Sequence, residues 1–230
     1  MAKKVSNTPT QAEANVGEIF SKSEKFIEKY KNVIIIGVAA VILIVVAILG
    51  VRHYYYLPKE KEAQAAIFPA ENYLANQQWE LALNGDDKDC IGFLAVMDEY
   101  GITKTAKLAK AYAGICYYHL GNTEEALNYL KKYKVDDKVI SPVITGLIGD
   151  CYVDMGQVKE GVNYFKQAAS KANSEVISPI YLKKAGLAYE TLQDYKSALE
   201  VYNTIKNSYS TSAEAQSIDK YIDRANSLLK

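Results

Sequence analysis

The chain has little of what nucleic-acid binding and histidine chemistry require. Its 27 basic and 27 acidic side chains give a formal net charge of zero, whereas a protein that tracks phosphates normally carries a basic surplus or stripe. Only two histidines occur, His53 and His119, which leaves little material for catalysis by histidine or for a His-rich metal site. We therefore predict no nucleic-acid partner.

Cysteine is equally scarce. The chain has three, and their spacing matches no metal-binding motif: Cys90, Cys116 and Cys151. The sequence contains no phosphate-binding glycine loop, no paired-histidine helix motif and no nucleophile elbow. The carboxylates of Asp86, Asp87 and Asp89 resemble a calcium loop only loosely, because the terminal glutamate is missing. We therefore predict no enzyme activity, no catalytic, metal or cofactor residues, and no small-molecule substrate.

One apolar run dominates the N-terminal quarter. Val33–Val51 comprises nineteen residues without a charged or polar side chain, and as a helix it would span about 28 Å, close to the hydrocarbon thickness of a bilayer. A buried core helix and a cleaved signal peptide are the alternatives, but a signal peptide would have a shorter apolar region nearer the start. We predict a transmembrane helix over 33–51 that remains as a single anchor.

Basic residues flank this run unequally. Four lysines precede it closely and three basic residues follow it: Lys22, Lys25, Lys29 and Lys31 before, Arg52, Lys59 and Lys61 after. By the positive-inside rule, residues 1–32 form a cytoplasmic tail and the long C-terminal part lies on the opposite side of the membrane. The tail's apolar residues share one helical face, which leaves open a helix on the inner leaflet or a continuation of the anchor.

The sequence beyond Val51 repeats itself every 35–37 residues. The tetrapeptide Val-Ile-Ser-Pro occurs at 139–142 and 176–179, and we expect its serine to cap a helix and its proline to stand at the first helical position. A glycine with an aromatic residue three positions later recurs in three places: Gly114 and Tyr117, Gly149 and Tyr152, Gly186 and Tyr189. Small and then large residues follow at fixed offsets: Ala126 and Leu130, Gly161 and Phe165, Ala198 and Tyr202.

This order of residues is typical of stacked helical hairpins, in which small residues let two helices approach and large ones fill the space toward the next pair. Gly121 and Gly156 are expected to end first helices, and Asp194 to cap a second helix where Gln193 replaces the glycine. The pattern resembles the tetratricopeptide repeat (TPR) family. The resemblance implies an all-α solenoid with three repeats at 107–141, 142–178 and 179–211.

The flanking segments are expected to complete the array. Residues 52–106 form a linker and a divergent hairpin, made from a helix over 59–84 that Pro69 kinks or interrupts near Phe68 and a second helix over 91–100. Thr211 and Glu214 form a capping box that opens a C-terminal capping helix over 212–230. Equivalent cysteines of adjacent repeats, Cys116 and Cys151, are predicted to be buried free thiols, because stacked helices lie too far apart for a disulfide.

The resemblance to TPR proteins also implies a binding face on the first helix of each hairpin. Its expected residues mix apolar and acidic groups, and form a candidate peptide-binding groove: Ala111, Ile115, Tyr118, His119, Gly146, Asp150, Val153, Asp154, Lys183, Leu187 and Glu190. Such a face suits an extended or helical peptide segment. The alternative is that it packs against the chain's own flanking helices.

The whole plan, a lysine-rich tail, one anchor and then repeats, resembles the YfgM-like proteins. The resemblance includes Phe26–Lys29, Lys61–Ala63, Ala113–Tyr117 and Tyr181–Gly186. It implies a protein of the bacterial inner membrane whose C-terminal domain lies in the periplasm, an accessory subunit of the Sec translocon that works with the periplasmic chaperone PpiD. The implied partners are translocon subunits, chaperones or exported chains. A structural scaffold for cell-envelope or outer-membrane assembly complexes is the alternative function.

Overall fold

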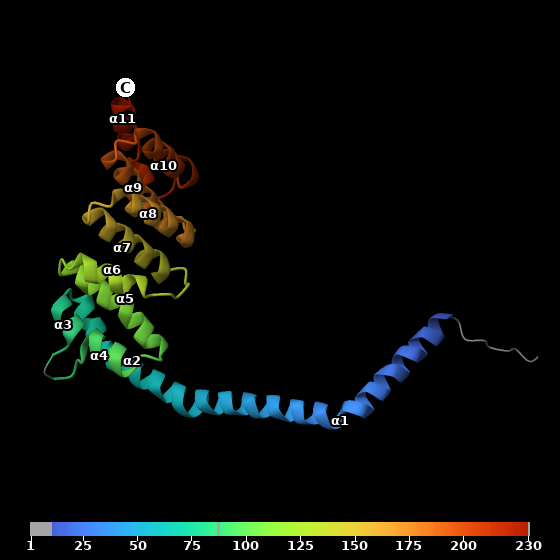
Figure 1. Ribbon diagram of the computed structural model, residues 1–230. Helices are drawn as coiled ribbons and strands as arrows, with labels where there is room; N and C mark the ends of the chain where they lie inside the picture. Colours follow the sequence, from blue (N-terminus) through green and yellow to red (C-terminus); the bar gives the residue numbers. More distant parts are fainter. Residues whose placement is uncertain (1–10, 87, 230) are drawn as a thin grey trace, which may run out of the picture. The chain divides into compact units, whose positions relative to one another are not determined.

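The computed structural model describes residues 11–86 and 88–229, with side chains from Glu28 onward. Every regular element in these residues is helical, so the predicted all-α class is confirmed (Figure 1). The chain divides into two compact units, Met1–Leu57 and Pro58–Lys230.

The first unit consists of a single long helix and a short π-helical turn. Helix α1 covers Gln11–Val51 and is followed by η1, Arg52–Tyr56. Residues 1–10 of the predicted tail lie outside the described residues, whereas 11–32 belong to α1, so the segment before the apolar run continues it. The apolar side chains of α1 are exposed (Ile36 68% and Leu43 69%), which argues against a buried core helix.

The described part of the chain contains one helix that is long and apolar enough to cross a membrane, and this helix includes the predicted anchor over 33–51.

The second unit is a stack of helical hairpins. Its elements are α2 (Leu57–Ala75), α3 (Trp79–Asn84), α4 (Gly92–Glu99), α5 (Lys104–His119), α6 (Thr123–Lys131), α7 (Ile140–Asp154), α8 (Val158–Ala172), α9 (Ile177–Thr191), α10 (Tyr195–Ser208), η2 (Ala215–Ser217) and α11 (Asp219–Leu228). Consecutive helices from α3 to α11 pack on one another, and Figure 1 shows them rising as a column from green to red.

The two helices of each hairpin meet at the repeat glycine. A Cβ on Gly114 would lie 2.6 Å from Leu130 Cγ, and one on Gly149 would lie 2.7 Å from Phe165 Cδ1. On Gly186 it would overlap the ring of Tyr202. The sequence predicts that the large residue fills the space toward the next repeat. The structure shows that it also packs on the glycine of its own hairpin.

Four interhelical turns share one backbone geometry. The turn residue has a positive φ in each, namely Gln77 (58°), Gly121 (81°), Gly156 (77°) and Gln193 (60°). In each turn the next residue's N–H donates to the carbonyl of the aromatic residue at the end of the first helix, as in Gln78 to Tyr73 and Asn122 to Tyr117, both at 2.9 Å. The turn between α2 and α3 is therefore a repeat turn in the same register as the other three.

The prediction of one helix over 59–84 is wrong, because this segment forms two helices, α2 and α3, with a turn at Gln77 between them. The first hairpin is formed by α2 and α3, which share one core cluster and are joined by the Gln77 turn. Helix α4 packs on α3, as the predicted pairing of 59–84 with 91–100 requires, and also on α5. The predicted interruption at Pro69 is also wrong, because α2 continues through it. Ile67 and Ala70 on either side of Pro69 are buried, so core packing holds the helix in spite of the missing hydrogen bond.

The predicted caps are correct in one place and wrong in three. Asp194 accepts a hydrogen bond from the Ser197 amide at 3.1 Å, which confirms it as a cap. The serines of the two Val-Ile-Ser-Pro segments are second helical residues instead, and the acceptors at these helix starts are the side chains of Asp137 and Ser174. The predicted capping box at 211–214 does not open the C-terminal helix, because only the short η2 follows it and α11 begins at Asp219.

We expect Gly186→Ala to lower the free energy of unfolding by about 1–3 kcal/mol, because the new methyl group forces the fully buried Tyr202 ring out of place. Chemical unfolding of the full chain in detergent, followed by circular dichroism, measures this. Glu200→Ala on the exposed side of α10 is the control and should change stability by less than about 0.5 kcal/mol. Equal stability of both variants would contradict the proposed helix contact.

Candidate functional site

The predicted groove residues lie on the first helices α5, α7 and α9, but two of them offer no surface. Ala111 is fully buried in a cluster with Ile144 and Ile148 of the next repeat. Gly146 is buried too, and a Cβ on it would overlap the ring of Tyr181. Both positions serve the packing between hairpins, because large neighbouring side chains fill the space above them.

The groove position four residues further along each first helix holds a different type of residue in each repeat. Ile115 is half-buried against the second repeat, and Leu187 is exposed. At the equivalent position of the second repeat, Asp150 forms an ion pair with Lys184, whose Nζ lies 2.6 Å and 2.9 Å from the two carboxylate oxygens. Burial raises the pKa of Asp150, and the nearby Lys184 ammonium opposes that rise.

A second polar contact joins the ends of α5 and α7. The pKa of Tyr118 is raised by burial first, and then by the negative charges of Asp154 and Asp150, with a hydrogen bond to the Asp154 side chain adding to the effect. Val153, which precedes Asp154, is half-buried and packs toward α8 and α9. Tyr118, Asp150 and Asp154 therefore form one acidic group on this face, in which Tyr118 is hydrogen-bonded to Asp154.

Three predicted groove residues are engaged elsewhere in the fold. The His119 ring stacks on Trp79 of the preceding hairpin, with 4.1 Å between ring centroids and 8° between ring planes. Glu190 accepts a hydrogen bond from the Tyr202 hydroxyl at 2.8 Å and pairs with Arg224 at 2.7 Å. Lys183 Nζ lies 5.0 Å above the Tyr221 ring of α11. At the C-terminal repeat the face is thus partly covered by the chain's own last helix.

Three apolar side chains on the same face were missed by the sequence analysis. Leu108 is half-buried, Val143 is 41% exposed and Ile180 is 39% exposed. They occupy equivalent positions in the three repeats, six residues before each repeat glycine. The register that identifies the glycines therefore also identifies these residues, and together with Leu187 they supply the accessible apolar surface of the first helices.

The cysteine thiols are buried, as predicted for Cys116 and Cys151, and all three are free. Burial raises the pKa of Cys116 and of Cys151 to about 12, so neither thiol is a nucleophile at neutral pH. Within residues 28–86 and 88–229, no three His, Cys, Asp or Glu side chains are grouped as a metal site would require.

Comparisons with known proteins agree with this geometry. Models of the tetratricopeptide repeat family match residues 109–136 and 182–212, and a further one matches 146–170. In these segments the helical hairpins are similar to tetratricopeptide repeats. Two structures of the nearly identical TPR-like repeats of a putative kinesin light chain from Podosopora anserina, one of them a point variant, have the same fold, with TM-scores of 0.55 and 0.56.

Each of these structures is 14% identical to the chain, and each match covers 73% of this chain and 86% of the other. No curated protein matches the sequence. TPR hairpins are scaffolds for protein–protein contact, and the chain is therefore an interaction module with protein partners.

We expect Lys184→Met to destabilise the fold by about 1–2 kcal/mol at pH 7, because it leaves the half-buried Asp150 carboxylate without its partner. The loss is smaller than for a fully buried pair, since the Lys184 side chain is 40% exposed.

The effect of this variant depends on pH. Removing Lys184 raises the already elevated pKa of Asp150. The loss of folding stability is therefore absent while Asp150 is protonated, and it grows as pH rises through that pKa. Unfolding curves between pH 3 and pH 7 measure this, with Lys166→Met on the exposed side of α8 as control. A pH-independent loss would contradict the assigned ion pair.

Proposed function

We propose that this chain is an inner-membrane-anchored TPR module that faces the periplasm and serves as an accessory to the Sec translocon, where it engages exported chains or their periplasmic chaperones. The observation that carries the proposal is the line of accessible apolar side chains on the first helices, Val143, Ile180 and Leu187, beside the acidic group of Asp150 and Asp154. Apolar side chains at helical spacing next to charged groups suit peptide segments that are not yet folded.

The apolar helix α1 supports the membrane part of the proposal. Its exposed Val, Ile and Leu side chains over 33–51 match the hydrocarbon core in length and composition. The excess of lysine before this segment favours a cytoplasmic N-terminus and hence periplasmic repeats. A tether beside an export channel raises the effective concentration of the repeats, so weak contacts with an emerging chain suffice for capture.

Photocrosslinking in intact bacteria tests the proposal. We expect a photoreactive residue at position 143 or 180 to form adducts with translocon subunits, a periplasmic chaperone or exported chains, because these positions lie on the accessible apolar line. The same residue at position 160, exposed on the second helix α8, is the matched control and should give few adducts. Adducts with cytoplasmic proteins, or with envelope-assembly complexes alone, would contradict the proposed site of action.

A further inference from the structure

A pocket of about 700 Å³ lies between the start of α5, the loop that follows α6 and the start of α7. Its apolar lining comes from all three elements, through Leu108 on α5, Val135 in the loop, and Val139 and Ile140 at α7. This volume falls in the range of ligand-binding pockets. Leu108 is the first-repeat equivalent of Val143 and Ile180, so the pocket adjoins the apolar line of the first helices.

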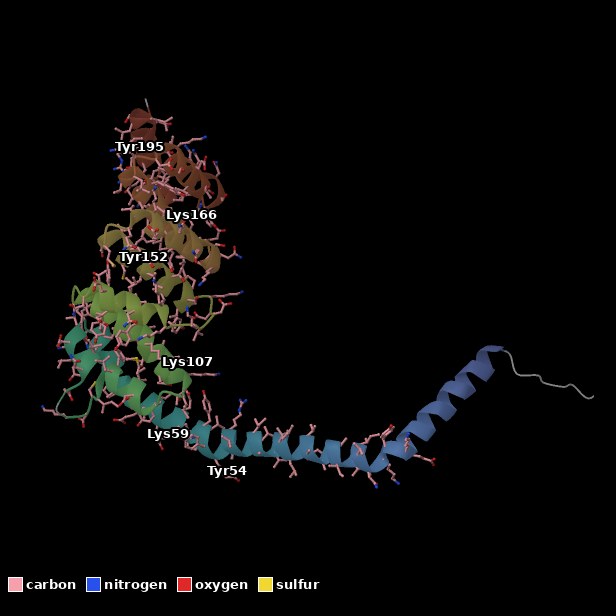
Figure 2. The ribbon with its side chains drawn as sticks, in the orientation of Figure 1. Tyr54, Lys59, Lys107, Tyr152, Lys166 and Tyr195 are labelled. Atoms are coloured by element: carbon pink, nitrogen blue, oxygen red, sulfur yellow. The ribbon has the colours of Figure 1, made fainter. Side chains whose placement is uncertain are left out.

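Three lysines surround this apolar lining. Lys104 and Lys107 come from the first turns of α5, and Lys134 comes from the loop. Figure 2 shows Lys107 extending away from the start of α5. Among the side chains that the structure describes, none of these three ammonium groups has a carboxylate within ion-pair distance.

Two carboxylates beside the pocket already accept hydrogen bonds from other groups. Asp137, the one acidic residue of the lining, accepts hydrogen bonds from the Val139 amide at 2.9 Å and from the Tyr133 hydroxyl at 3.0 Å. Glu60 accepts from the Lys104 amide at 2.7 Å and the Thr105 hydroxyl at 2.8 Å. Among the described residues, neither carboxylate forms an ion pair with Lys104, Lys107 or Lys134, so these ammonium groups remain available to an external anion.

The placement of Lys104 and Lys107 is electrostatically unfavourable for the isolated fold. Both lie at the N-terminal end of the 16-residue helix α5, where the helix dipole disfavours cations and favours anions. Glu60 and Thr103 already accept hydrogen bonds from the first N–H groups of α5, so an anionic group in the pocket would interact with the lysine ammonium groups. Charge complementarity thus points to an acidic ligand over an apolar floor.

We propose that this pocket binds a peptide segment in which large apolar side chains are flanked by carboxylates on both sides. The proposal deepens, and rests on, the proposed function of the chain as an interaction module for protein segments. The apolar side chains occupy the floor formed by Leu108, Val139 and Ile140. The carboxylates on one side pair with Lys104 and Lys107, and those on the other side pair with Lys134 of the facing loop.

Fluorescence anisotropy with the full chain in detergent micelles tests the pocket. The probe is a labelled peptide with the core Glu-Asp-Leu-Phe-Glu-Asp, and the reference peptide replaces its four acidic residues by lysine. We expect the acidic peptide to bind at least 10-fold more tightly than the lysine peptide. Lys107→Glu and Lys134→Glu should each weaken the acidic peptide at least 10-fold, and Leu108→Asn should weaken it by a similar factor.

Lys159→Glu, an exposed lysine on α8, makes the same charge change away from the pocket and should alter affinity less than twofold. Thermal unfolding shows that each variant is folded. We expect Lys107→Glu to fold normally, since an acidic residue near the start of a helix is favourable. Equal binding by the parent and the pocket variants, or equal binding of both peptides, would overturn the proposal.

A water-soluble short-chain phosphatidylglycerol serves as the competing anion. If this lipid binds with dependence on Lys107 and Lys134 while the peptide does not, the pocket is a lipid site and the proposal is wrong. If peptide binding fails but crosslinks from position 143 persist in cells, only the pocket assignment fails. If the pocket binds the peptide but those crosslinks are absent, the pocket assignment stands and the proposed function fails.

Discussion

The contact between each repeat glycine and the large side chain sixteen residues later determines how the helices of this array pack. Leu130, Phe165 and Tyr202 each lie where a Cβ on Gly114, Gly149 or Gly186 would have to be. This close approach sets the distance between the two helices of a hairpin, and the large side chains also contact the following repeat. Because the same contact recurs at fixed spacing, equivalent residues of successive first helices fall on one line, which creates a continuous face for a partner.

Much of this arrangement can be predicted from the sequence, because it depends on residues at fixed offsets. The glycine, aromatic, small and large positions identify three hairpins, and the same register predicts the burial of Cys116 and Cys151. The first hairpin escapes detection because Ala70 and Gln77 stand where the other repeats have mostly glycine. Gln77 and Gln193 nevertheless adopt positive φ, since the hydrogen bonds and packing of the turn outweigh the cost of that conformation.

The candidate site is predicted less well than the fold. Register places a residue on a helix face, but the contacts between hairpins decide whether it is accessible. Ala111 is covered by the next repeat, and Glu190 is paired with Arg224 of α11, a helix whose start the sequence does not reveal. The Asp150–Lys184 pair joins residues 34 positions apart on different hairpins. The lysine-lined pocket is equally non-local, since it requires the loop after α6 to face the start of α5.

The account's central claim is that partners bind the first-helix face and its adjoining pocket. Hydrogen exchange of the full chain, measured by mass spectrometry in its native membrane with and without captured partner, tests this most directly. The account predicts that a partner slows exchange in the first helices α5, α7 and α9 and in the loop over 132–139, and leaves α6, α8 and α10 unchanged. Protection confined to the second helices α6, α8 and α10 would contradict it.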